Sequence, residues 1–403
     1  MTGRKTMLFR ISAIAILLAV IAGLEAFHPF RGFRLLTFTA VFFLFAVLAT
    51  LTRRGLRDGV IVAASIALAL TLAEAGAAFS ETSELNTVAE GFYTNHPILG
   101  VAPGHPGVYH HEKKDPKSKA NVFKVDYTID SNLLREVRAA KGGPAIVFFG
   151  DSFTFGLGVN DQDTLPQQFA NLLNAGQSVL NIGFSGYSPA QFLREEETGL
   201  FDHVIGANPK LFIFQTAAFH AERTSCKASW TASAPRYTLL DDAVSFQGRC
   251  FAGPRLWTRE WFENSAAYRA FASPIVNQIN HNDVELYIRI LKEAVRLAKT
   301  KYGAPTLIPY IRVADAYLAR TGFTNEMVID RLRETGGYVV DASLVQEASR
   351  GAVIEIQGDG HPTPLANRLR AALLKDYIEH NISGVLSESR IQSGANSLPA
   401  TGP

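Results

Sequence analysis

A serine stands where a predicted strand gives way to a helix. Residues 144–150 read PAIVFFG, a continuous apolar run typical of a buried parallel strand, and Ser152 follows within Gly150-Asp151-Ser152. Ligand crevices of open α/β sheets lie beyond the carboxyl ends of the strands. Ser152 is therefore a candidate nucleophile, and the N–H groups that open the next helix could hold a developing oxyanion. Helix capping is the alternative role for its side chain.

A base for this serine is offered near the C-terminus. Residues 358–362 read GDGHP and precede a predicted amphipathic helix. Residues i and i+2 share a face in extended backbone, so Asp359 and His361 can both turn toward one site. An imidazole activates a serine hydroxyl, and a carboxylate fixes the imidazole tautomer. We expect Ser152, His361 and Asp359 to act together; a loop histidine without a role is the alternative.

A glycine-containing turn follows the second predicted strand. Residues 181–187 read NIGFSGY. A glycine can present its N–H to an oxyanion without steric obstruction, so Gly183 and the N–H of Ser152 are the expected donors. An ordinary glycine turn would leave the same pattern.

Strands and helices alternate after Gly142, which predicts one parallel sheet covered by helices on both faces, a three-layer α/β/α fold. The expected strands are 144–150, 179–183, 210–216, 306–311 and 338–341. The expected helices are 165–174, 189–200, 284–301, 325–334 and 364–378.

The first 80 residues have a different composition. Apolar runs at Met7–Phe27, Leu35–Leu51 and Gly59–Phe79 are each near the ~20 residues that cross a bilayer as a helix. We expect three transmembrane helices, with a cleavable signal peptide as the alternative for the first. Glu25 and Glu74 lie near span ends, where a carboxylate can reach interfacial water.

Basic residues give the expected orientation. They lie at the start of the first span and between the second and the third: Arg4, Lys5, Arg10, Arg53, Arg54 and Arg57. Such segments stay cytoplasmic. Three spans would then place the remaining chain on the periplasmic or extracellular side of an inner or plasma membrane, in a multi-pass protein.

Four regions follow from these patterns. Residues 1–80 form the membrane anchor, 81–141 an extended segment, 142–385 the main domain and 386–403 a Ser/Gly/Pro-rich tail expected to be disordered. An insertion at 222–280 holds all three tryptophans and both cysteines. A disulfide between Cys226 and Cys250 and two free thiols are both compatible with the sequence.

Several classes of protein are excluded or disfavoured. The formal net charge is +2, without a dense basic tract in the main domain, which excludes nucleic acid as the main partner. Phosphate-binding, zinc-protease and nucleophile-elbow motifs are missing, and the adjacent His110 and His111 lie in what reads as an exposed charged loop. We assign no cofactor and no metal.

These blocks together resemble the SGNH/GDSL hydrolase superfamily. Gly150–Gly156 is similar to its first block, Gly183 to its second-block glycine, and Asp359 with His361 to its late block. The likeness covers about 144–378, and 126–135 is similar to the lead-in of bacterial membrane-anchored members. The resemblance implies a flavodoxin-like sheet and a Ser-His-Asp arrangement.

Two departures from the superfamily pattern concern the site. The late block is usually Asp-x-x-His, but here a single residue separates Asp359 from His361. The third block, Gly-x-Asn-Asp, is absent, and residues 215–223 read QTAAFHAER instead. His220 or Gln215 could replace the missing oxyanion-hole asparagine, while a buried structural histidine is the alternative.

The resemblance implies a membrane-anchored serine hydrolase acting on ester bonds, of the esterase, lipase or carbohydrate deacetylase type. Its partner would be an ester-bearing small molecule, lipid or glycan. One alternative is an O-acyltransferase that modifies an envelope or exported polysaccharide. Another is a catalytically weak glycan-binding protein, which the absence of the third-block asparagine favours and the retention of Ser152, Asp359 and His361 disfavours.

Overall fold

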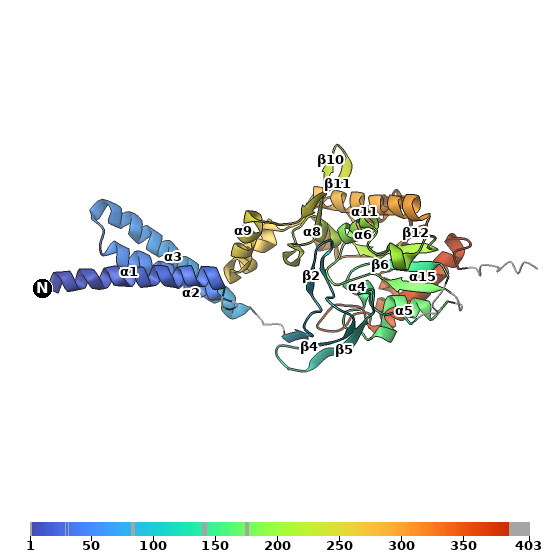
Figure 1. The fold of residues 1–403 in the computed structure, drawn as a ribbon, viewed down its shortest axis with the longest axis horizontal. Coiled ribbons are helices and arrows are strands. Elements are labelled where there is room, and N and C mark those ends of the chain that lie inside the picture. Colours follow the sequence, from blue (N-terminus) through green and yellow to red (C-terminus); the bar gives the residue numbers. More distant parts are fainter. Residues whose placement is uncertain are drawn as a thin grey trace, which may run out of the picture.

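A computed structural model describes residues 2–28, 30, 32–81, 85–138, 143–173 and 177–386 of the chain. Three helices project from one side of an α/β domain (Figure 1). The expected disordered tail lies outside the described residues from position 387 onward.

The projecting helices are α1 (Thr2–Phe27), α2 (Phe33–Ala49) and α3 (Arg54–Ser80). By length and composition, two helices of the described chain could cross a membrane, α1 from Arg4 onward and α3. Helix α2 has 17 residues, which amounts to about 25 Å and falls short of the ~30 Å hydrocarbon core. The expectation of three spans is therefore wrong by this measure.

Both basic clusters lie at the end of the helices that is remote from the domain. Arg10 Nη1 donates to the carbonyl of Thr50 at 3.2 Å, which places the start of α1 beside the α2–α3 turn. The opposite ends of α1 and α3 meet the α/β domain (Figure 1).

The segment expected to be merely extended forms two small antiparallel sheets. One has the order β1-β4-β5 and the other pairs β2 with β3. Their bounds are β1 Leu85–Val88, β2 Thr94–His96, β3 Gly100–Ala102, β4 Gly107–Lys114 and β5 Asn121–Ile129. His110 and His111 lie in β4, not in a loop, and alternation makes His110 exposed and His111 buried.

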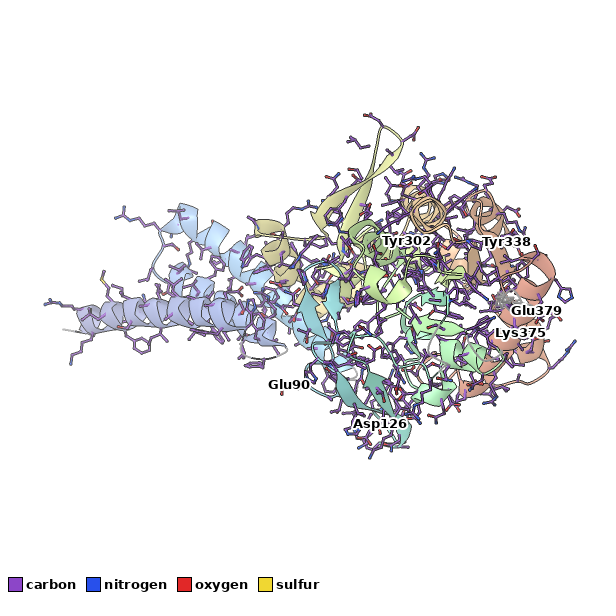
Figure 2. The ribbon with its side chains drawn as sticks, turned by 45° about the vertical axis from the view of Figure 1, so that its right-hand side comes forward. Glu90, Asp126, Tyr302, Tyr338, Lys375 and Glu379 are labelled. Atoms are coloured by element: carbon purple, nitrogen blue, oxygen red, sulfur yellow. A yellow bond between two sulfur atoms is a disulfide. The ribbon has the colours of Figure 1, made fainter. Side chains whose placement is uncertain are left out.

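The central sheet is parallel, with the order β13-β12-β8-β6-β7. Its strands are β6 Ala145–Phe149, β7 Ser178–Asn181, β8 Leu211–Phe214, β12 Thr306–Ile311 and β13 Tyr338–Asp341, and the short β9 (Thr216–Ala217) also pairs with β12. Every expected strand is present, and Figure 2 shows Tyr338 of β13 on the side of the domain opposite the projecting helices.

Helices cover both faces of this sheet. The main ones are α5 Leu165–Ala170, α6 Pro189–Thr198, α11 His281–Tyr302, α13 Asn325–Arg333 and α15 Pro364–Asn381. Strand β6 illustrates the two interfaces: Val147 and Phe149 pack in the cluster with α6, α11 and α13, whereas Ile146 and Phe148 pack with α5 and α15. The three-layer α/β/α arrangement is thus present.

Shorter helices fill the loops. They are α4 Ser152–Phe155, η1 Asp161–Asp163, α7 Asp202–Ile205, α8 His220–Thr224, η2 Ser229–Thr231, α12 Asp315–Leu318 and α14 Val345–Ser349.

The insertion is a hairpin followed by helices. Its elements are β10 Pro235–Leu240, β11 Ala243–Arg249, α9 Pro254–Glu263, the π-helix η3 Tyr268–Ala272 and α10 Ser273–Val276. A disulfide joins Cys226 to Cys250 and closes the base of the hairpin.

Candidate active site

Ser152 is the first residue of α4, directly beyond the carboxyl end of β6. The tight turn needs a glycine at 150, because a Cβ there would lie 1.9 Å from Thr154 Oγ1. Asp151 caps the helix by accepting the N–H of Phe153 at 2.9 Å. The Ser152 side chain is therefore not the cap and is available for chemistry.

The structure brings the three expected residues together. His361 Nε2 lies 2.9 Å from Ser152 Oγ, and His361 Nδ1 contacts Asp359 Oδ2. The unusual one-residue spacing is accommodated because Gly358 and Gly360, on either side of Asp359, both have positive φ, of 80° and 88°. The hydroxyl, imidazole and carboxylate groups of these residues are thus arranged like the side chains of a serine triad.

Lys113 of β4 completes this arrangement, and no sequence motif pointed to it. Its Nζ donates to Asp359 Oδ1 at 2.8 Å. Burial by itself would raise the pKa of Asp359, but hydrogen bonds from His361 and Lys113 lower the pKa to about 2. An ionised Asp359 favours the tautomer with the proton on His361 Nδ1, which leaves Nε2 to accept the Ser152 hydroxyl.

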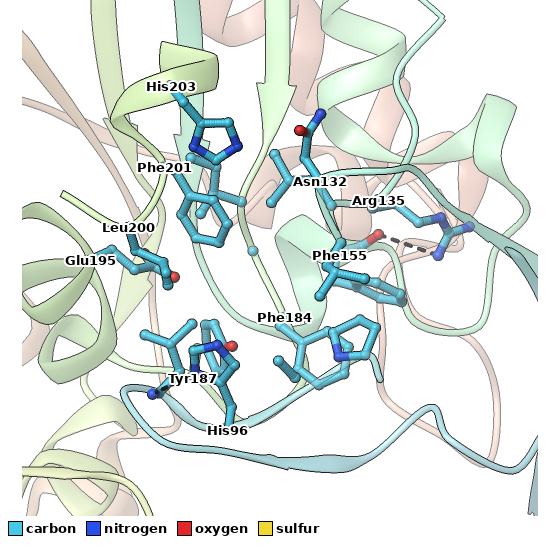
Figure 3. A pocket seen from close by; sticks show the side chains of 17 residues that line it. His96, Asn132, Arg135, Phe155, Phe184, Tyr187, Glu195, Leu200, Phe201 and His203 are labelled. Carbon is cyan, nitrogen blue, oxygen red and sulfur yellow. Dashed lines mark hydrogen bonds between the residues drawn. The ribbon is translucent and has the colours of Figure 1, made fainter. Parts of the chain in front are cut away.

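Gly183 does not lie where the sequence led us to expect it. Its N–H donates to Asn181 Oδ1 at 3.2 Å, and it lines a separate small cavity of about 130 Å³ (Figure 3). That cavity, beside Phe184 and Glu195, does not include Ser152. The expectation that Gly183 donates to an oxyanion is therefore not supported.

Gly186, three residues later in the same turn, lines the pocket that contains Ser152. Its φ of +83° favours glycine, and an added Cβ would lie 3.1 Å from Trp230 Cδ1. No acceptor for its N–H is found within the described part of the chain. We missed Gly186 because nothing local distinguishes two glycines in one turn.

His220 and Gln215, the two candidates for replacing the missing asparagine, do not face the pocket that contains Ser152. His220 is buried, with Nδ1 2.9 Å from Thr216 Oγ1 and Nε2 3.2 Å from Asp151 Oδ2, so both ring nitrogens are engaged. Gln215 accepts the hydroxyl of Thr154 at 2.7 Å. Neither lines the pocket with Ser152, and the expectation of His220 in the oxyanion hole is not supported.

Arg223, also missed by the sequence, links two parts of the site. Its Nη1 donates to Asp151 Oδ2 at 2.8 Å and to the carbonyl of Tyr187 at 2.7 Å. Burial by itself would raise the pKa of Asp151, but Arg223 and His220 hold that pKa well below its usual range. Arg223 therefore fixes the Gly186 turn relative to the helix that carries Ser152.

The pocket around Ser152 and His361 has a volume of about 810 Å³. The insertion supplies much of its wall, including Trp230, Arg249, Phe251, Leu256 and Glu260. Within the described residues, no group of three or more His, Cys, Asp or Glu side chains could hold a metal ion.

Solved structures similar to this chain include an esterase, TesA and a carbohydrate acetylesterase family member. The esterase EstA from Pseudoalteromonas sp. matches with a TM-score of 0.36 and 10% identity, covering 59% of this chain and 98% of its own. TesA matches with a TM-score of 0.34 and 14% identity, covering 59% of this chain and 98% of its own. A carbohydrate acetylesterase family member from Sinorhizobium meliloti matches with a TM-score of 0.32 and 15% identity, with the same coverages.

The expected likeness to SGNH/GDSL hydrolases is thus found among solved structures. No protein-family model and no curated protein matches the sequence. Because the identities and TM-scores are low, the roles proposed below rest on the geometry of the site itself.

Proposed function

We propose that this chain is a membrane-anchored serine hydrolase that cleaves ester bonds through an acyl-enzyme on Ser152. The observation that carries the proposal is the 2.9 Å contact between Ser152 Oγ and His361 Nε2, with Asp359 on the opposite ring nitrogen. Such an arrangement activates a hydroxyl that is otherwise a weak nucleophile.

Acylation requires two proton transfers, one to His361 and one from it. Ser152 Oγ attacks the ester carbonyl carbon while His361 Nε2 takes the hydroxyl proton. The carbonyl oxygen becomes an oxyanion, which the N–H groups of Ser152 and Gly186 stabilise. When the intermediate collapses, the C–O bond to the alcohol breaks and His361 returns the proton to the leaving alcohol.

Deacylation repeats the sequence with water. His361 takes a proton from water, whose oxygen attacks the acyl carbon, and Ser152 Oγ leaves with the proton from His361. The products are a carboxylic acid and the free enzyme. Asp359, held ionised by Lys113, stabilises the imidazolium formed in both steps.

We further propose that α1 and α3 anchor the enzyme in an inner or plasma membrane. Both helices have the length and apolarity for spanning. Helix α2 ends beside the start of α1 and so returns the chain to the basic end between the two spans. With that basic end cytoplasmic, α1 and α3 both run outward and the α/β domain faces the periplasm or cell exterior.

An O-acyltransferase is the second candidate, and the size of the pocket favours it. A volume of about 810 Å³ with Trp230 and Phe251 in the wall leaves room for an acceptor sugar beside an acylated Ser152. Added acceptor that diverts the acyl group from water during turnover would identify this activity. Hydrogen-bonded Ser152, His361 and Asp359 weigh against a protein that only binds glycans.

The test is turnover of p-nitrophenyl acetate by the full chain in detergent. Ser152→Ala should lower the rate by roughly 10⁴-fold or more, since removing the nucleophile removes the covalent route. Ser233→Ala provides the matched control, because Ser233 lines the same pocket but contacts the carbonyl of Gly100. Equal rates in the two variants would refute the serine mechanism.

A further inference from the structure

The junction segment, residues 254–276 (α9, η3 and α10), is fastened to the projecting helices by their charged side chains. Glu74 of α3 is fully buried and accepts three hydrogen bonds from this segment. The donors are Ser265 Oγ at 2.6 Å, the N–H of Ala266 at 2.8 Å and the N–H of Ala267 at 3.0 Å. A buried carboxylate with this many donors fixes the segment against α3.

Two arginines add further contacts. Arg34 of α2 is buried and pairs with Glu25 of α1. Its guanidinium group donates to the carbonyl of Trp261 at 3.1 Å and lies 4.5 Å from the centre of the Trp261 ring. Arg269 of η3 donates to both carboxylate oxygens of Glu81, at 2.8 and 2.9 Å. The charged residues near the span ends therefore join the helices to the catalytic domain.

The position of Glu74 along α3 sets the depth of these contacts. Glu74 follows Arg54, the first residue of α3, by 20 residues, which is about 30 Å of helix and matches the thickness of the hydrocarbon core. With Arg54 at the cytoplasmic boundary, Glu74 reaches the outer one. The junction segment then lies in the outer interface, and Figure 1 shows α9 beside this end of the helices.

Large apolar side chains of the junction segment are mostly exposed in the described part of the chain. Trp257, Phe271, Ile275 and Val276 are 60%, 64%, 72% and 62% exposed. Aromatic and aliphatic side chains at this depth are typical of elements that lie in a membrane interface. Continuity with α3 identifies the outer leaflet as the surface that covers them.

The same segment also forms part of the active-site wall. Leu256 and Glu260 of α9 line the pocket that contains Ser152 and His361. The neighbouring Trp257 is not among the residues that line this pocket, and its side chain is largely exposed. One helix therefore separates the catalytic pocket from the membrane interface.

We propose that the junction segment inserts its exposed apolar side chains into the outer leaflet and that the pocket receives an ester carried by a membrane-anchored amphiphile. The choice of substrate rests on the proposed hydrolase function, whereas the insertion does not. Holding the pocket at the lipid surface lets an ester group reach Ser152 while its apolar chain stays in the bilayer.

Insertion is tested with the full chain in phosphatidylcholine nanodiscs. Trp230→Phe with Trp261→Phe leaves Trp257 as the sole tryptophan, and a lipid brominated near the headgroup should quench its fluorescence. The control carries Trp257→Phe in addition and Tyr338→Trp as its only tryptophan, on the side of the domain opposite the helices (Figure 2). Strong quenching confined to Trp257 supports insertion, and equal quenching at the two positions overturns it.

The substrate is tested with two esters that share one chromophore. The triple variant Phe271→Asn, Ile275→Asn, Val276→Asn should lower turnover of p-nitrophenyl palmitate, presented in the nanodisc, by about tenfold, while turnover of water-soluble p-nitrophenyl acetate changes by less than about twofold. Val345→Asn, at a residue of α14 that is 61% exposed, is the control and should alter neither rate.

The outcomes separate the two proposals. Equal loss of both activities, unchanged palmitate turnover in the triple variant, or an unsubstituted protein that cleaves only the acetate would each overturn the lipid-borne substrate. An unsubstituted protein that cleaves neither ester would refute the hydrolase and the substrate with it. The quenching measurement would still decide whether the junction segment meets lipid.

Discussion

Lys113 Nζ lies 2.8 Å from Asp359 Oδ1, although the two residues are 246 positions apart in the chain. Strand β4 of the N-terminal sheet thereby holds the carboxylate that orients His361. The segment between the projecting helices and the main domain is thus a structural part of the candidate active site.

Lys113→Met should lower kcat for p-nitrophenyl acetate by about tenfold with little change in KM. Asp359 would lose the hydrogen bond that fixes its second oxygen, and His361 would be less well oriented. Lys113→Arg should recover part of kcat because it restores a cationic donor. The control is Lys114→Met, since Lys114 pairs with Glu112 away from the site. A fall in thermal stability without a fall in kcat would limit Lys113 to a structural role.

Gly186→Ala should lower kcat by roughly 10²-fold, the cost of misplacing an oxyanion donor. The new Cβ would meet Trp230, and the residue has positive φ. Gly336→Ala is a matched control, since Gly336 has a φ of +90° but no atom within 4 Å of an added Cβ. Both changes carry similar backbone strain, so equal effects on kcat would show that Gly186 is not an oxyanion donor.

Two buried histidines, His111 and His220, should weaken the fold as the pH falls from about 6.5 toward 4, against the opposite contribution of Glu195 and Glu196, whose pKa values burial raises. Burial lowers the pKa of His111 and of His220 to about 4 in the folded state, while both return to about 6.5 on unfolding. Over this interval these two histidines bind more protons in the unfolded chain, so their protonation favours unfolding, by about 3 kcal/mol for each histidine at pH 4. Relative to the unsubstituted chain, His111→Gln should raise Tm at pH 4 compared with Tm at pH 6.5, whereas substitution of the exposed His380 should leave this difference unchanged.

Opening the disulfide should cost about 3 kcal/mol of stability, because it closes a loop between residues 24 positions apart. The loop carries Trp230 and Arg249 of the pocket wall. We expect the Cys226→Ser, Cys250→Ser double variant to melt at lower temperature and to raise KM for bulky esters more than for p-nitrophenyl acetate. An equal change in KM for the bulky esters and for p-nitrophenyl acetate would show that this loop does not contribute to binding of the larger substrates.

The sequence alone was sufficient for the strands of the main sheet and for selecting the three side chains that meet at the candidate site. Continuous apolar runs such as 144–150 are short-range signals of buried parallel strands, and every expected strand is present. Ser152 and the Asp359–His361 pair stand next to glycine turns at helix starts, so their types and neighbours marked them as candidates.

Tertiary structure decided the rest, because it depends on which distant groups meet. Gly183 and Gly186 share one turn, and only packing against Asn181 and Trp230 determines which N–H is free. His220 Nε2 contacts Asp151 Oδ2, and the two residues are 69 positions apart in the chain, so folding alone brings them together.

The links from Lys113 to Asp359 and from Glu74 to residues 265–267 join segments more than 190 residues apart. A sequence records the hydrophobic period and the turn chemistry of each element. The direction of a hydrogen bond between elements is set only when they pack, since it requires both the distance and the angle between groups from different parts of the chain.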